Sequence, residues 1–149
     1  MQPTLTPPRR VFVDTQGWAE VFHQPALHHA LALQIMQHAR DDARELITTN
    51  LILSELLPLF RSRHFRLSQL QVLAVITQIR ALPNLTLLHV DEQADQQAWG
   101  LRYSNAQQPW SHVDATSMVL MRQLGLTDIL TDILTADHHF AQAGFIVLL

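Results

Sequence analysis

Short apolar runs alternate with longer amphipathic stretches along this chain. The first run, Val11 to Val13, ends at Asp14, and similar runs occupy 45–49, 85–90 and 145–149, with a strand-like segment DILT before the last. Apolar runs of this length, bounded by turn-forming or polar residues, are typical of buried β-strands. We therefore expect about five strands, separated by helical sequence.

Helical periodicity fills the segments between these runs. From Ala26 to about Ala43 the apolar positions recur at helical spacing, which predicts an amphipathic helix with Leu27, Ala30, Leu31, Ile35 and Met36 on its apolar face. Asn50 is a good cap for a helix over 51–63, and Pro58 is expected to kink that helix. Further helices are predicted from Trp18 to Phe22 and onward past Pro25, over 67–82 with Ser68 as cap, over 91–102, from near Asp114 to Gly125, and over 136–144.

Strands that alternate with helices predict an α/β fold, a three-layer α/β/α sandwich around a mostly parallel sheet. The 149 residues, 48% of them hydrophobic, suffice for one domain over 1–149, with 1–9 as a short N-terminal tail. The tetrapeptide TDIL occurs twice, at 127–130 and 131–134. This doubling suggests a small insertion that leaves one copy as strand and the other as loop, and the placement of Asp137 depends on which copy forms the strand.

Composition narrows the functional classes. No apolar run approaches the roughly 18 to 20 residues of a membrane span, so we expect no membrane partner and a cytoplasmic location. The chain has no cysteine, which excludes disulfides and thiolate metal sites. The net charge of -3 argues against a large, indiscriminate nucleic-acid surface.

Four acidic residues lie at the ends of predicted strands or near the starts of predicted helices: Asp14, Glu55, Asp114 and Asp137. In open α/β sheets ligands gather at the carboxyl ends of the strands, where distant side chains converge. Carboxylates are the ligands that Mg²⁺ and Mn²⁺ prefer, and such ions activate water for phosphodiester hydrolysis. A shared metal pocket is therefore the leading interpretation.

Each acid also has a simpler interpretation. Asp14, Asp114 and Asp137 each suit a helix cap. Glu55 fits the solvated side of its helix, although its apolar neighbours make an unpaired charge there costly. Capping and metal binding are compatible, because a carboxylate has two oxygens.

The chain resembles the PIN-domain family of small metal-dependent ribonucleases, which includes the VapC toxins. VFVDT resembles the family's first strand, with Asp14 as the acid and Thr15 as the accompanying hydroxyl. ITTNLILSELL resembles the second block with Glu55, VDATSMVLMRQLG the third with Asp114 and Ser117, and TADHHFAQAGFIVLL the fourth with Asp137. All four blocks occur in order, so the resemblance covers nearly the whole chain from Val11. Asp132 is the alternative fourth acid if the doubled TDIL is threaded differently.

The resemblance implies a Mg²⁺ or Mn²⁺ centre built from the four acids and endonucleolytic cleavage of RNA by activated water. Some relatives are toxins that a small antitoxin protein holds inactive. We expect Thr15, Asn50 and Ser117 to support the site by hydrogen bonds to the acids or to water. The apolar positions from Leu51 to Phe60 fit either a surface for a homodimer or partner helix, or the core.

Arg61, Arg63 and Arg66 form the densest basic group in the chain. They suit contacts to RNA phosphates, and equally an interaction with the dipole of a helix end. Trp99 and Trp110 flank a polar loop, where an indole either stacks on a base or packs in the core.

The sequence was also compared with what other functions would require of it. One alternative is a non-catalytic PIN-like module that binds RNA or protein, although such a module has no need to keep all four acids. A phosphatase with Asp14 as nucleophile would need a second Asp where Gln16 stands, and a receiver domain would need a lysine, which the chain lacks.

The pairs His28-His29 and His138-His139 are poor zinc sites, since neighbours on a helix point about 100° apart. Only His138 is placed to approach the acids, beside Asp137.

Overall fold

The computed structural model describes residues 10–126, 132–135 and 137–149. Its five strands are β1 Arg10–Val13, β2 Glu45–Thr49, β3 Leu85–Leu88, β4 Asp132–Leu134 and β5 Ile146–Val147. Its helices are α1 Thr15–Phe22, α2 His29–Asp41, α3 Asn50–Arg61, α4 Gln69–Arg80, α5 Glu92–Ser104, α6 His112–Gln123 and α7 His138–Gln142. The expected tail over 1–9 and the first TDIL copy lie outside the described residues.

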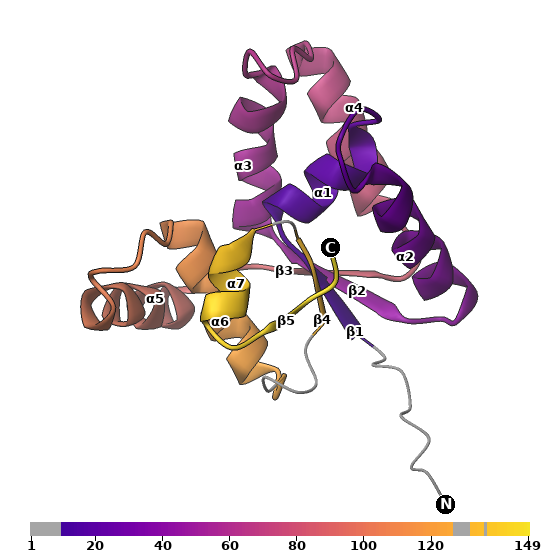
Figure 1. Ribbon diagram of the computed structural model, residues 1–149. Helices are drawn as coiled ribbons and strands as arrows, with labels where there is room; N and C mark the ends of the chain where they lie inside the picture. Colours follow the sequence, from indigo (N-terminus) through magenta and orange to yellow (C-terminus); the bar gives the residue numbers. More distant parts are fainter. Residues whose placement is uncertain (1–9, 127–131, 136) are drawn as a thin grey trace, which may run out of the picture.

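The strands form one parallel sheet in the order β3-β2-β1-β4-β5. The chain therefore moves outward from β1 through β2 to β3, then crosses to the other side of β1 for β4 and β5. Because parallel crossovers are right-handed, this reversal puts α1–α4 on one face and α5–α7 on the other. Figure 1 shows these two groups of helices on opposite sides of the sheet. The predicted three-layer α/β fold is confirmed.

The central strand is buried on both faces, as a parallel strand between helical layers must be. Val11, Phe12 and Val13 have no exposed surface. Thr48, in the neighbouring strand, donates its hydroxyl to the Val13 carbonyl at 2.9 Å and accepts the indole N–H of Trp18 at 3.0 Å. This chain of hydrogen bonds fixes α1 against the end of β1, which is where Asp14 lies.

The second helix is shorter than expected and faces the core differently. It begins at His29, not at Ala26, and Leu27 is 89% exposed. The buried positions of α2 are Ala32 and Ala39, with Ile35 and Met36 half-buried between them. Small residues at these positions let α2 approach the rest of the fold closely. Periodicity alone did not predict which side of α2 would be buried. The preceding helix α1 likewise ends at Phe22 and does not run past Pro25.

Three helix starts show which residues do the capping. Thr49, not Asn50, caps α3, because its hydroxyl accepts the Ile52 N–H at 3.1 Å. Asp114 does not begin α6. Ser111 caps that helix, and Asp114 is the third residue of a capping box, since its carboxylate accepts the Ser111 N–H at 3.0 Å. The predicted Ser68 cap of α4 is confirmed.

The remaining expectations concern α3, α6 and β4. Pro58 lies inside α3, and four apolar side chains of that helix are buried in this chain's own core: Ile52, Leu53, Leu56 and Phe60. Those side chains are therefore not a surface for a homodimer or partner helix. The predicted stop of α6 is confirmed by Gly125, which takes a left-handed φ of 71° after the helix. The second TDIL copy supplies β4.

No helix in the described part of the chain is both long and apolar enough to cross a membrane.

Candidate metal centre

The four predicted acids come together at the carboxyl edge of the sheet, beside the point where the strand order reverses. Asp14 directly follows β1, and Asp137 follows β4, the strand that pairs with β1. Glu55 reaches this edge from the second turn of α3, and Asp114 from the first turn of α6. Open parallel sheets bind ligands at such a switch point, because the loops on either side diverge and leave a crevice.

Asp14 is the most deeply buried of the four, with 4% of its surface exposed. One carboxylate oxygen caps α1 by accepting the Gly17 N–H at 2.8 Å, and the other accepts the Thr135 hydroxyl at 2.8 Å. The pKa of Asp14 is raised to about 8, mainly by burial; the two hydrogen bonds lower it, and the negative charges of Asp137 and Asp114 raise it. Asp14 therefore caps α1 while its carboxyl group also lies near two of the other acids.

Thr135 links two of the acids and was not predicted from the sequence. Its buried hydroxyl donates to Asp14 and accepts the backbone N–H of Asp137 at 2.9 Å. One side chain thereby ties the end of β1 to the start of α7. A threonine two residues before an acid is a common local turn pattern, but its partner Asp14 lies 121 residues away, so local sequence gave no sign of the bridge.

Glu55 lies at the rim of this group and is partly buried. Desolvation raises the pKa of Glu55, and the charges of Asp114 and Asp137 raise it as well, while a hydrogen bond from Thr15 lowers it. Thr15, one of the expected supporting residues, therefore influences the ionisation of Glu55. The shared influence of Asp114 and Asp137 on both Asp14 and Glu55 shows that all four carboxyl groups face one region.

The tightest potential ligand set is Asp114, Asp137 and His139, whose ligand atoms lie within 4.8 Å of one another. The His139 Nδ1 atom is 3.1 Å from the Asp137 carboxylate and 3.4 Å from that of Asp114. His139, not His138, approaches the acids, and His138 is exposed. The cap of α7 brings the two residues together, because the Asp137 carboxylate accepts the backbone N–H of His139 at 2.9 Å.

A divalent cation fits these residues. The charges of Asp114 and Asp137 raise the pKa of both Asp14 and Glu55, and this repulsion becomes attraction once a positive ion lies between the carboxyl groups. The donor atoms are hard oxygens plus one imidazole nitrogen, a set suited to Mg²⁺ or Mn²⁺. Each Asp14 oxygen has a second lone-pair direction beyond its present hydrogen bond, so capping leaves it able to bind an ion.

The other predicted supporting residues differ in their relation to the acids. The Asn50 side chain accepts the Val90 N–H at 2.8 Å, and so joins α3 to the segment after β3 and bonds to none of the acids. Ser117 lies one turn after Asp114 on α6, buried, and its hydroxyl has no hydrogen-bond partner among the described residues. Thr15, by contrast, lowers the pKa of Glu55.

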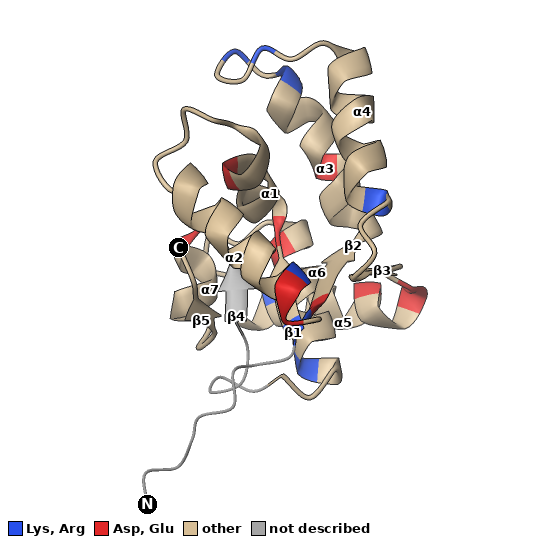
Figure 2. Ribbon diagram, turned by 90° about the vertical axis from the view of Figure 1, so that its right-hand side faces the viewer, with Lys and Arg blue, Asp and Glu red and all other residues tan. Residues whose placement is uncertain are grey.

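The three arginines lie outside the acidic group. Arg61 ends α3, and Arg63 and Arg66 lie in the connection to α4, all exposed. Arg61 is 3.4 Å from Gln69, and Arg66 donates to the Arg63 carbonyl at 3.0 Å. Figure 2 shows basic positions at the tip of the α3–α4 pair, away from the sheet edge. The arginines are therefore free of acidic partners among the described residues, which leaves them available to an anionic ligand.

Replacing Asp14 with Asn tests the cost of the buried carboxyl group. In metal-free buffer the unfolded chain loses this proton near pH 4, whereas the folded chain keeps it to about pH 8. As pH rises through that window, ionisation therefore favours the unfolded state, and stability present at low pH is lost. We expect wild type to lose up to about 1.4 kcal/mol of unfolding free energy per pH unit relative to Asp14→Asn, measured by urea unfolding in chelator. A difference that stays constant with pH would contradict the argument.

Replacing His139 or His138 by alanine, one at a time, tests which histidine belongs to the ligand set. His139→Ala should weaken Mn²⁺ binding about 10-fold or more, because it removes the nitrogen nearest two carboxylates. His138→Ala is the matched control, since this neighbour is exposed and lies outside the ligand set. Calorimetric titration with Mn²⁺ measures both. Equal affinities in the two variants would remove His139 from the site.

Comparison with known proteins supports one assignment. No family model matches the chain. It is 26% identical over 136 residues to the 23S rRNA-specific endonuclease VapC20 of Mycobacterium tuberculosis, in strains CDC 1551 and H37Rv, covering 91% of this chain and 95% of the relative. The crystal structure of VapC20, a Sarcin-Ricin loop cleaving toxin, matches with a TM-score of 0.76 and covers 91% of this chain and 96% of that one. Sequence and fold thus match a VapC protein over nearly the full length, in agreement with the resemblance to the PIN-domain family that the four acidic blocks indicated.

Proposed function

We propose that this protein is a divalent-metal-dependent endoribonuclease that hydrolyses RNA phosphodiester bonds. The observation that carries the proposal is the convergence of four carboxyl groups, from four separate parts of the chain, at the switch point of a parallel sheet. The full-length similarity to an rRNA endonuclease supports the same reaction. An interaction module without catalysis would gain nothing from gathering charges that repel one another.

Asp14, Glu55, Asp114 and Asp137 are the proposed catalytic residues and metal ligands, with His139 as an additional ligand. When bound, Mg²⁺ or Mn²⁺ would activate water and neutralise charge on the phosphate oxygens. Asp14 is held rigidly by Gly17 and Thr135, which orients its carboxylate. Glu55, partly exposed and with a raised pKa, is the carboxylate best suited to accept a proton from the attacking water. Ser117, buried and without a partner one turn from Asp114, is placed to bond water within the site.

The relatives suggest the substrate and the biological role. VapC20 is described as specific for 23S rRNA and as a toxin that cleaves the Sarcin-Ricin loop. We propose that this chain likewise cleaves an exposed loop of ribosomal RNA, and that it is the toxin of a toxin–antitoxin pair. A small antitoxin protein would then hold it inactive, and growth arrest on expression without that partner would be the cellular sign.

Cleavage of 23S rRNA by the purified protein is the direct test. We expect wild type to cut in Mg²⁺ or Mn²⁺ and to be inactive in chelator, and Asp14→Asn to lose more than about 100-fold of the rate, since outer partners of metal ligands alone are worth 10- to 100-fold. Asp41→Asn, an exposed acid at the end of α2, should cut as wild type does. Wild type that binds RNA without cutting it in either metal would favour the non-catalytic module.

The exposed arginines Arg61, Arg63 and Arg66 are proposed RNA contacts. Each Arg→Ala change should reduce the slope of log affinity against log salt by about 1, because one fewer counterion is released from RNA. Arg80→Ala, exposed at the opposite end of α4, is the control. Binding is followed by anisotropy of a labelled RNA loop in chelator. Unchanged slopes in all three variants would assign these arginines to the helix end alone.

A further inference from the structure

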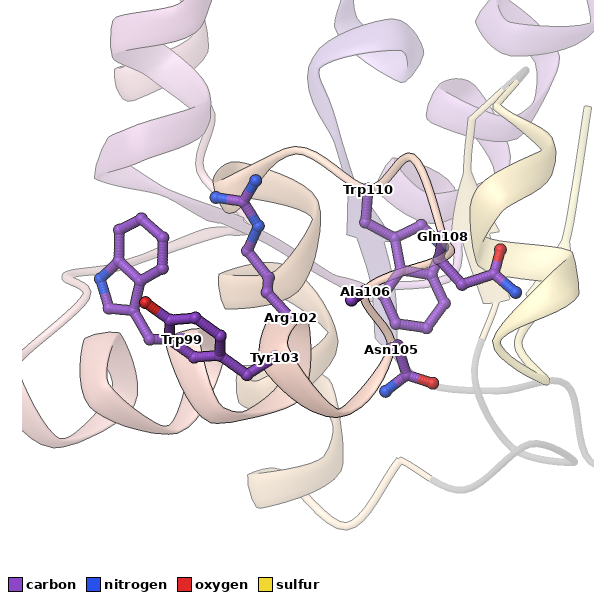
Figure 3. Close-up of a pocket in the computed structure, with 7 residues that line it drawn as sticks. All are labelled: Trp99, Arg102, Tyr103, Asn105, Ala106, Gln108 and Trp110. Carbon is purple, nitrogen blue, oxygen red and sulfur yellow. The ribbon is translucent and has the colours of Figure 1, made fainter.

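A small cavity opens between the end of α5 and the loop that leads into α6. Its volume is about 220 Å³, and its lining includes Trp99, Arg102, Tyr103, Asn105, Gln108 and Trp110. Figure 3 shows these side chains, with Arg102 between the two indoles and the Gln108 amide at the far side. The proposed catalysis uses none of these residues.

Aromatic and cationic side chains dominate the open side of this cavity. Tyr103 is 80% exposed and Trp99 is 44% exposed, one turn apart on α5. The Arg102 guanidinium lies over the Trp99 ring, 5.1 Å from its centroid. Large aromatic surface is rarely left in water without a use, and aromatic rings beside arginine form the platforms on which proteins stack unpaired bases.

The cavity is built to hold its shape. The imidazole of His112 stacks on Trp99 at 4.1 Å and bonds to the Asp95 carboxylate at 2.6 Å. Trp110, at the inner wall, is buried, and its indole N–H has no partner among the described residues. An aromatic wall held in place in this way suits a ligand with a planar face.

One wall of the cavity is joined to the acidic group by the start of α6. Trp110 precedes Ser111, whose backbone N–H is 3.0 Å from the Asp114 carboxylate. The start of α6 therefore carries one wall of the cavity and one proposed metal ligand. An RNA strand whose phosphate lies at the carboxylates would have neighbouring nucleotides close to this cavity.

The lining favours a nucleobase over a protein side chain or a second copy of the chain. The amide groups of Asn105 and Gln108 match the donors and acceptors of a base edge, and Arg102 supplies positive charge for a polyanion. The volume of the cavity is below the range of about 300 to 1,000 Å³ for pockets that enclose a drug-sized ligand. The cavity therefore suits a single base, with the sugar and phosphate outside.

We propose that the cavity formed by Trp99, Arg102, Tyr103 and Trp110 binds one unpaired base of the RNA, beside the phosphate held at the carboxylates. This inference rests on the proposed ribonuclease function for the identity of its ligand. According to this proposal, α5 and the loop that follows it select RNA with unstacked bases, such as the bases of RNA loops.

Fluorescence of a 2-aminopurine base in a short single-stranded RNA reports stacking directly. With wild type in chelator, where no cleavage occurs, we expect quenching on binding. Tyr103→Ala and Trp99→Ala should abolish the quenching and raise Kd about 5- to 150-fold, the range for loss of one stacked base. Tyr103→Phe, which keeps the ring, should behave as wild type, and Leu70→Ala, an exposed apolar side chain on α4, is the control.

The outcomes separate this inference from the proposed function. Wild type that cleaves RNA while all variants quench equally would overturn the base site and leave the nuclease standing. Ring-dependent quenching by a protein that never cleaves would leave the base site standing without the nuclease. If sedimentation shows that Tyr103→Ala instead disrupts self-association, with quenching unchanged, the surface is a protein interface and the base site is wrong.

Discussion

The buried carboxyl group of Asp14 is the constraint around which this molecule is organised. Asp14 directly follows the central strand and is almost inaccessible to solvent. Asp137 and Asp114 lie close enough that their charges add to the rise in its pKa. Gly17 and Thr135 donate hydrogen bonds to it, yet they offset only part of the cost of burial. A fold that keeps such an arrangement is matched to a bound cation, which converts repulsion among the acids into attraction.

The sheet topology explains how residues so distant in sequence share one site. The strand order reverses beside β1, so the segments after β1 and β4 diverge and leave room between them. Helix caps then aim the side chains: Asp14 caps α1, Asp137 caps α7, and Asp114 belongs to the capping box of α6. Each of these three acids therefore serves the local structure and the proposed chemistry at once, and hydrogen bonds to the helix starts fix its position.

The start of α6 connects the acidic group with the aromatic cavity. Ser111 and Asp114 form the capping box at the acidic edge, while Trp110, directly before them, forms the wall of the aromatic cavity. Similarity to VapC20 extends over nearly the whole chain and accounts for the scaffold. The aromatic cavity, in contrast, is argued from the side chains of this chain alone, and it is where a preference for particular RNA loops would arise.

The sequence by itself determined the alternation of strands and helices, the parallel sheet and the order of the four acids, because these follow from local periodicity and from polar residues at element ends. It placed Ser68 and Gly125 correctly for the same reason. Only the tertiary structure decided that α2 buries Ala32 and Ala39 while Leu27 is exposed, that Thr135 bonds to Asp14, and that His139 joins Asp114 and Asp137. Those contacts depend on residues that are far apart in the sequence and that meet only when the chain packs. No local sequence pattern predicts them.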